Sequence, residues 1–187
     1  FNVNLSRAEM GRVMKKIGVS MIGQTEKFVP ADKKLYALRD VTATVESIPL
    51  ISASIMSKKM GEGCDVLVLD IKCGNGAFMT DIKQARELGG TMVAIGKEMG
   101  RKVSALITDM NQPLGIMVGN ANEVAESIDC LKGGGPNDLM QVTFALTARM
   151  LVLAGAAKDT KAAQTMMEKA INSGAALEKF RALIKEH

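Results

Sequence analysis

Three side chains that could bind a ligand stand at helical spacing between residues 47 and 60. Ile51, Ser54 and Lys58 occupy positions i, i+3 and i+7, which places an apolar contact, a hydroxyl and an ammonium along one stripe of a helix. Such a stripe could hold a flat polar heterocycle. Arg39, shortly upstream, could offer a planar fork of N–H donors to a carbonyl of the same ligand. The alternative is an exposed lysine and a serine hydroxyl bonded back onto its own helix.

Two further groups of residues are candidates for ligand contact. The loop 72–78 carries Gly74 and Gly76 between a predicted strand and a predicted helix, where open backbone amides can meet an anion. It lacks the third glycine of a GxGxxG motif, so a purely structural turn is the alternative. Glu126 follows the irregular stretch 112–115, whose carbonyls could join its carboxylate around a hard cation, the alternative being a solvated carboxylate.

The periodicity of the sequence predicts the helices and strands that would position these residues. Ser6 is followed three residues later by an acid, a capping pattern that begins a helix, and Gly18 ends it. Short apolar runs over 65–71 and 103–108 indicate buried strands, and a helical pattern over 81–99 separates them. Strand, helix and strand make a βαβ unit, which requires a parallel pair of strands. Further helices are expected over 30–38, 47–60, 123–131, 139–154, 160–172 and 174–185, and a short strand over 19–23.

This order of elements predicts an α/β fold in two parts. Two glycines close together mark a hinge at 61–64, where the charge balance also changes. We expect residues 1–29 to be a segment of the α/β domain and 30–60 to be a portion of a small helical domain. Residues 65–187 are expected to form part of the larger α/β domain, with a mainly parallel sheet. Because the first residue is Phe1 and not methionine, we expect the chain to be a fragment of a longer protein.

Composition narrows the class of protein. Apolar residues at 47% and charged residues at 24% are typical of a soluble globular domain. Residues 1–61 hold ten Lys and Arg against five Asp and Glu, but aromatic residues at 3% and the absence of Trp argue against a nucleic-acid partner. No apolar run approaches the roughly 20 residues that a membrane span needs. Three cysteines without a CxxC pair fit a reduced, cytoplasmic protein, and a single histidine, His187, excludes a His-centred triad.

One long segment resembles a known family. Residues 31–51 read ADKKLYALRDVTATVESIPLI, which closely resembles the signature segment of the thymidine and pyrimidine-nucleoside phosphorylases, and the resemblance continues through 52–59, 72–79 and 108–115. It implies reversible phosphorolysis, in which inorganic phosphate as co-substrate attacks the anomeric carbon of uridine, thymidine or deoxyuridine. The products are the free base and a pentose 1-phosphate. The resemblance implies no organic cofactor, a homodimer and a cytoplasmic location.

The resemblance also implies roles for individual residues. Arg39, Ser54 and Lys58 would be the catalytic residues, holding the base through its carbonyls and ring nitrogen. Because the base departs with growing negative charge, cationic donors aimed at its oxygens favour the transition state over the substrate. The residues that match positions packed around the base are Tyr36, Ile51 and Phe78.

Glu126 and the backbone carbonyls of Leu114 and Met117 match a monovalent-cation site of the family, which suggests potassium. The family's phosphate loop, which contains Lys-His-Ser, is not found in this sequence. The chain is therefore expected to supply the base-binding half of the site, to close about the hinge at 61–64, and to be inactive alone. There are two alternatives to this hypothesis: an anthranilate phosphoribosyltransferase-like enzyme, and a non-catalytic dimerisation module.

Overall fold

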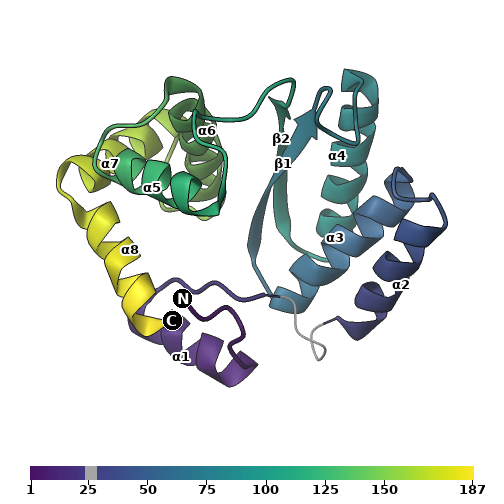
Figure 1. Cartoon of the computed structure of the whole chain (residues 1–187), viewed down its shortest axis with the longest axis horizontal. Coiled ribbons are helices and arrows are strands. Elements are labelled where there is room, and N and C mark those ends of the chain that lie inside the picture. Colours follow the sequence, from purple (N-terminus) through teal and green to yellow (C-terminus); the bar gives the residue numbers. More distant parts are fainter. Residues whose placement is uncertain (24–28) are drawn as a thin grey trace.

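Helices dominate the structure, a computed structural model that describes residues 1–23 and 29–187 apart from the side chain of Asp40. Two strands lie side by side near the middle of the molecule, with helices on either side (Figure 1). The elements in chain order are α1 (Arg7–Ile17), α2 (Pro30–Val41), α3 (Ile48–Glu62), β1 (Val66–Cys73), α4 (Ile82–Glu98), β2 (Lys102–Asp109), α5 (Asn120–Leu131), α6 (Asn137–Leu153), α7 (Thr160–Asn172) and α8 (Ala175–Glu186). The α/β class predicted from the sequence is confirmed.

Local capping signals fix the ends of α1 as the sequence predicts. The backbone N–H of Ser6 donates to the Glu9 carboxylate at 2.8 Å, and the Ser6 hydroxyl accepts from the backbone N–H of Glu9 at 3.3 Å. These two bonds satisfy donors that would otherwise be free at the start of the helix. Gly18 ends the helix with a φ of +78°, a conformation that glycine adopts without steric cost.

The short strand predicted for 19–23 is wrong. The segment is irregular, and its backbone amides have separate partners: Gly23 donates to the carbonyl of Val3 at 2.8 Å, and Met21 donates to Nε2 of His187 at 3.2 Å. A strand needs a neighbouring strand that repeats its hydrogen bonds along a ladder. The apolar run in this segment therefore reflects packing without strand pairing.

The predicted βαβ unit is confirmed. Strands β1 and β2 are parallel, with a register that runs from Val66 opposite Lys102 to Cys73 opposite Asp109. Helix α4 connects them, and its N-cap is the side chain of Asp81, which accepts from the backbone N–H of Lys83 at 2.6 Å. Residues that follow β1 and β2 consequently meet at the same edge of the sheet.

The main hydrophobic core lies between α3, α4 and the two strands. Its buried members are Ile51, Met56, Leu69, Ile71, Met79, Ala85, Leu88, Met92 and Val103. Helix α3 continues through Glu62 and is closed by Gly63 with a φ of +76°. The hinge predicted at 61–64 thus coincides with the last turn and cap of α3, and the proposed domain boundaries stay a prediction.

Helices α5 to α8 form a second group on the other side of the strands (Figure 1), where α6 packs against both β1 and β2. Helix α1 joins this group because the ammonium of Lys16 pairs with Glu186 at 2.7 Å and the ammonium of Lys179 donates to the carbonyl of Ile17 at 2.7 Å. None of the described helices combines the length and the apolarity needed to cross a membrane.

A pair of glycines in α4 provides a test of this packing. A Cβ added at Gly96 would stand 2.2 Å from Cγ2 of Val103, a stiff β-branched side chain of β2, whereas a Cβ at Gly90 would meet no atom within 4 Å. We expect Gly96→Ala to lower the free energy of unfolding by about 1–2 kcal/mol, because the energetic cost of overpacking is larger than the stabilisation that alanine brings through its higher helix propensity. Gly90→Ala should raise it by up to about 1 kcal/mol. Urea unfolding followed by circular dichroism measures both, and equal effects would contradict the packing described.

Candidate functional site

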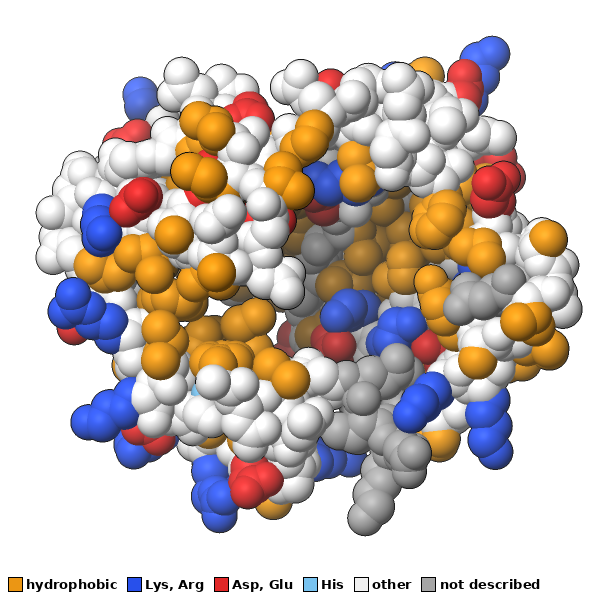
Figure 2. Space-filling model, viewed as in Figure 1, with side chains coloured by type: hydrophobic (Ala, Val, Ile, Leu, Met, Phe, Trp, Pro, Cys, Tyr) orange, Lys and Arg blue, Asp and Glu red, His pale blue; other side chains and the backbone are white. Residues whose placement is uncertain are grey.

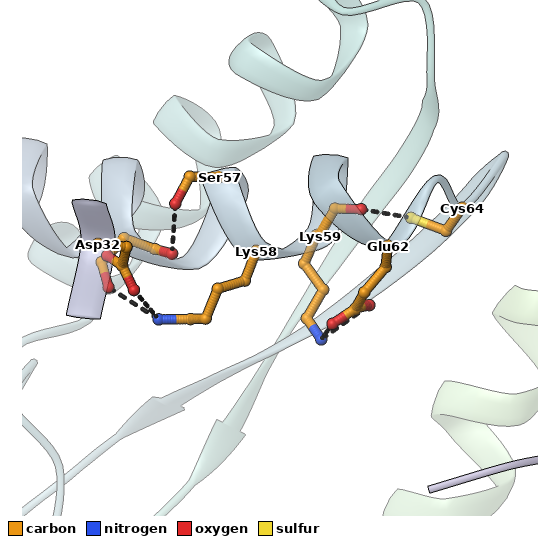
Figure 3. Close-up of polar contacts among 7 residues, drawn as sticks. Asp32, Ser57, Lys58, Lys59, Glu62 and Cys64 are labelled. Carbon is orange, nitrogen blue, oxygen red and sulfur yellow. Dashed lines mark hydrogen bonds and ion pairs between the residues drawn. The ribbon is translucent and has the colours of Figure 1, made fainter. Parts of the chain in front are cut away.

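Helices α2 and α3 hold a cluster of polar side chains. The ammonium of Lys58 donates to the carboxylate of Asp32 at 2.8 Å (Figure 3). It also donates to the hydroxyl of Ser54 at 2.9 Å. Ser54 and Lys58 stand one helical turn apart, as predicted, and Asp32 reaches them from the first turn of α2. Asp32 and Ser54 are both buried. Lys58 is partly exposed, and its ammonium holds the buried carboxylate by a hydrogen bond and by mutual attraction.

Arg39 is buried beside this cluster at the end of α2, with 6% of its surface exposed. Its guanidinium donates to three backbone carbonyls in the connection to α3 and in its first turn: those of Thr44, Val45 and Leu50. A guanidinium carries five N–H groups, so these bonds leave two N–H groups for a ligand. The three carbonyls hold the plane of the Arg39 guanidinium in place before a ligand binds. This reduces the side-chain entropy that would be lost on binding.

The ring of Tyr36 lies over both cations. The guanidinium carbon of Arg39 is 5.2 Å from the ring centroid, and the ammonium of Lys58 is 5.8 Å from it. Both distances suit a cation–π contact. The structure therefore brings together four of the residues singled out in the sequence, namely Tyr36, Arg39, Ser54 and Lys58.

Asp32 is a member of the cluster that sequence reasoning missed. Burial alone would raise the pKa of its carboxyl group, but hydrogen bonds from Lys58 and Ser54, and the positive charges of Lys58 and Arg39, outweigh burial and lower the pKa below its usual value. Asp32 is therefore ionised at neutral pH. Its position in the first turn of a predicted helix was visible in the sequence, but that position is equally typical of an exposed acid, and the partner lies 26 residues away.

An apolar pocket of about 550 Å³ lies between α3, α4 and β1, and the side chains of the polar cluster are not among the residues that line it. Ile51 and Phe78, two predicted base-packing residues, line it, and Ile51 precedes Ser54 by one turn of α3. Figure 2 shows the molecule hollowed over the central strands, with hydrophobic side chains on the wall of the hollow. Phe78 is 58% exposed, so its ring is free to cover a ligand.

A polar network stands at the rim of this pocket. The ammonium of Lys72 pairs with Asp70 at 2.6 Å and donates to the hydroxyl of Thr108 at 3.0 Å, and that hydroxyl donates to Asp70. Asp70 and Lys72 line the pocket. The sequence analysis missed this network, although the strand register, which sets Lys72 opposite Thr108, could have indicated it.

Four backbone N–H groups of the loop 72–78 have partners within the protein and are not open to an anion, and contact of this loop with a ligand stays a prediction. Its backbone N–H groups donate within the protein: Gly74 to Met79, Asn75 to the side chain of Asn111, Gly76 to Met110 and Ala77 to Gly74. A Cβ at Gly74 would lie 2.8 Å from the backbone of residues 110 and 111. The two glycines allow this loop to pack against the loop that follows β2.

Glu126 is buried on α5 and is wrapped by the segment that follows β2. Its Oε1 atom accepts from the backbone N–H groups of Ile116 and Met117, at 3.0 and 3.2 Å. Gly115 has a φ of +77°, and a Cβ there would stand 2.4 Å from the Oε2 atom of Glu126. Within the part of the chain that the structure describes, no three His, Cys, Asp or Glu side chains form a group that could hold a metal ion. The cation site predicted at Leu114, Met117 and Glu126 stays a prediction.

Comparison with known proteins identifies relatives of this chain. Residues 1–177 match the family described as glycosyl transferase family, a/b domain. The chain is 51% identical over 185 residues to the pyrimidine-nucleoside phosphorylases of Staphylococcus aureus strains USA300 and NCTC 8325 / PS 47, and 50% identical to that of strain bovine RF122 / ET3-1. Each match covers 99% of this chain and 43% of the relative's length. The chain thus spans less than half of the curated relatives that it matches.

The anchoring of Arg39 predicts that lysine cannot replace it. Arg39→Lys keeps the charge but cannot reach three carbonyls at once, so we expect the free energy of unfolding to fall by about 2–3 kcal/mol. Arg101→Lys is the matched control, because Arg101 pairs at the surface with Asp65, whose side chain is 93% exposed, and should cost less than about 1 kcal/mol. Urea unfolding measures both variants. Equal stability of the two would show that the carbonyl contacts do not hold the connection between α2 and α3.

The lowered pKa of Asp32 predicts a dependence of stability on pH. Its ionised form stabilises the fold above the unfolded-state pKa of about 3.9, and this contribution is lost as the pH falls through the lower folded-state pKa. The difference in unfolding free energy between wild type and Asp32→Asn should be largest near pH 7. It should shrink as the pH falls from about 5 toward 2, in urea unfolding at a series of pH values. A difference that is constant or grows over this range would contradict the assignment.

Proposed function

The chain belongs to the glycosyl transferase family, a/b domain, and from this premise we propose that it is the base-binding part of a pyrimidine-nucleoside phosphorylase. The reaction is the attack of inorganic phosphate on the anomeric carbon of a pyrimidine nucleoside, with release of the base and a pentose 1-phosphate. The observation that carries the proposal is that Arg39 and Lys58 both lie within 5.8 Å of the ring centroid of Tyr36, while Lys58 also contacts Ser54. The names of relatives 51% identical to the chain support it independently.

The cluster suits the edge of a uracil-like base. Such an edge presents a ring N–H flanked by two carbonyl oxygens. Lys58 uses two of its three N–H groups on Asp32 and Ser54, so one is left for a carbonyl, and Arg39 has two N–H groups left for the other. Ser54 would contact the ring nitrogen.

These donors would also act on the chemical step. When the bond between base and sugar breaks, the electron pair of that bond stays with the base, and negative charge spreads onto its carbonyl oxygens. Donors from two cations favour this state over the neutral base of the substrate, and burial strengthens the interaction. Because Arg39 is already held by backbone carbonyls, little reorganisation is needed when the charge develops.

The apolar surroundings would orient the base. Tyr36, Ile51 and Phe78 offer flat or aliphatic surfaces to a ring whose edge lies against the polar cluster. Ile51 is part of the hydrophobic core, so its position is fixed by packing, whereas the exposed ring of Phe78 can adjust. Uridine, thymidine and deoxyuridine all present the same base edge and are proposed as substrates.

Several parts of the proposal concern the whole protein. The chain covers 43% of the length of its relatives, and we expect phosphate to be bound by residues outside it, so that the chain alone is inactive. The whole protein is proposed to be a cytoplasmic homodimer without an organic cofactor. Closure about the end of α3, at 61–64, would bring phosphate and base together.

Potassium remains part of the proposal. The residues present could supply only part of a site for a monovalent cation. The Oε1 atom of Glu126 already accepts from two backbone N–H groups. A cation would therefore use the Oε2 atom together with the carbonyls of Leu114 and Met117. A bound cation would hold the segment around Gly115 against α5. Asp138 already holds this segment, because its carboxylate accepts from the backbone N–H of Gly115 at 3.0 Å, and this bond lowers the pKa of Asp138.

Titration with uracil tests the proposed site. We expect the chain to bind uracil and Lys58→Gln to weaken binding by at least about tenfold, because a charged donor to a buried carbonyl is lost. The matched control is Lys59→Gln, since Lys59 pairs at the surface with Glu62 at 2.8 Å on the same helix. Isothermal titration calorimetry measures the affinities, and circular dichroism checks the fold of each variant.

Three results would overturn the proposal. Equal uracil affinities of the Lys58→Gln and Lys59→Gln variants would remove Lys58 from the site. A chain that forms a dimer but ignores uracil would favour the dimerisation module, and binding of a phosphoribosyl diphosphate in place of the base would favour the phosphoribosyltransferase-like enzyme.

A further inference from the structure

A second polar cluster lies at the carboxyl ends of β1 and β2, and the proposed base-binding contacts do not use it. The ammonium of Lys72 pairs with one carboxylate oxygen of Asp70 at 2.6 Å and donates to the hydroxyl of Thr108 at 3.0 Å. That hydroxyl donates to the other carboxylate oxygen. Three side chains from neighbouring strands thus form a closed ring of hydrogen bonds, which fixes their positions. The carboxyl ends of parallel strands are the place where α/β proteins bind ligands.

The ring of hydrogen bonds leaves capacity for a ligand. The ammonium of Lys72 has three N–H groups, of which partners in the described part of the chain take two. The carboxylate of Asp70 can accept about four hydrogen bonds, and Lys72 and Thr108 supply two. Asp70 and Lys72 therefore present an unused acceptor beside an unused donor. Their side chains are 24% and 34% exposed, so a ligand can reach both.

The position of this pair relates it to the proposed base site. Asp70 and Lys72 are the only charged residues among the described residues that line the apolar pocket, which Ile51 and Phe78 also line. Ile51 stands about 5.4 Å along α3 from the turn that holds Ser54. In a pyrimidine nucleoside the pentose is attached to the ring atom opposite the edge that would face Ser54. The pentose of a nucleoside bound in this way would extend away from the cluster between α2 and α3, toward this pocket.

We propose that Asp70 and Lys72 bind a hydroxyl group on the pentose of the nucleoside, and that Thr108 is a positioning residue that orients both. This inference rests on the proposed function and names further substrate-binding residues for it. A sugar hydroxyl both donates and accepts hydrogen bonds, so it complements an acceptor beside a donor. The pair carries no net charge, and its carboxylate would repel phosphate. A neutral hydroxyl therefore fits the pair better than an anion does.

Lys72→Met tests the donor, because it removes the ammonium and keeps most of the length of the side chain. We expect the affinity for uridine to fall by at least about tenfold, since a hydrogen bond from a charged group is lost. The affinity for uracil, which has no pentose, should not change. The matched control is Lys132→Met, since Lys132 pairs at the surface with Asp129 at 3.1 Å, and it should change neither affinity. Isothermal titration calorimetry of the chain with each ligand measures the affinities.

Variants of Asp70 and Thr108 separate positioning from a merely structural role. Asp70→Asn replaces one acceptor oxygen by a donor group and should weaken the binding of uridine alone. Thr108→Val removes the hydroxyl with little change in shape and should do the same, because Asp70 and Lys72 lose their shared partner. Thr108→Ser restores the hydroxyl and should restore the wild-type ratio of uridine to uracil affinity. A residue with a structural role alone would affect both ligands equally.

Chemical labelling of the wild-type chain tests the same contact without any substitution. Acetic anhydride acetylates exposed lysines, and mass spectrometry measures the rate at each position. At about ten times its Kd, uridine should slow the acetylation of Lys72 by about tenfold, because the occupied site shields the ammonium. Uracil should leave the rate at Lys72 unchanged. Neither ligand should alter the rate at Lys132, which is the internal control.

The outcomes are distinct. A wild-type chain that binds neither uracil nor uridine overturns the proposed function and this inference together. The inference alone is overturned if the chain binds uracil but not uridine, or if Lys72→Met keeps the affinity for uridine or weakens both ligands equally. A variant that loses affinity for inorganic phosphate and keeps that for uridine would reveal an anion site and overturn it as well. Circular dichroism monitors folding, and where Lys72→Met does not fold, equal labelling of Lys72 with uracil and with uridine overturns the inference.

Discussion

The half-buried ion pair between Asp32 and Lys58 is the interaction on which the site depends. It ties the first turn of α2 to the middle of α3 across 26 residues of sequence, and it fixes the ammonium at 2.8 Å from a carboxylate inside the protein. Such a pair is a weak source of stability, because desolvation offsets much of the attraction, but it strongly specifies geometry once formed. The carbonyl contacts of Arg39 act in the same way at the other end of α2. Two cations are thus held in place before any ligand arrives.

Helix α3 connects this polar cluster to the hydrophobic core. Ile51 and Met56 of α3 pack with β1 and α4, while Ser54 and Lys58 of the same helix meet Asp32. Because α3 is anchored in the core, the side chains of the cluster are held rigidly. Such rigidity suits a site that must stabilise developing charge without moving. The close approach of Gly96 to Val103 lets α4 lie near the strands.

Much of the fold could be predicted from the sequence because its signals are local. The capping pattern at Ser6 and the apolar runs of β1 and β2 depend on neighbours in the chain, and the structure confirms these elements. A strand forms only beside a partner strand, and the apolar run at 19–23 does not reveal whether such a partner is present. The spacing of Ser54 and Lys58 placed them on one stripe, but Asp32 and the carbonyl partners of Arg39 arise from tertiary contacts. Hydrogen bonds to backbone carbonyls, moreover, cannot be predicted from the pattern of side chains in the sequence.

We propose that the cluster between α2 and α3 binds the edge of a pyrimidine base. The most direct measurement is a crystal structure of the chain with 5-bromouracil, whose bromine locates the ring by anomalous scattering. This binding mode predicts the ring against Tyr36, with its carbonyl oxygens and ring nitrogen at about 3 Å from Arg39, Ser54 and Lys58. Bromine at any other place on the molecule, with these three side chains contacting protein atoms alone, would contradict it.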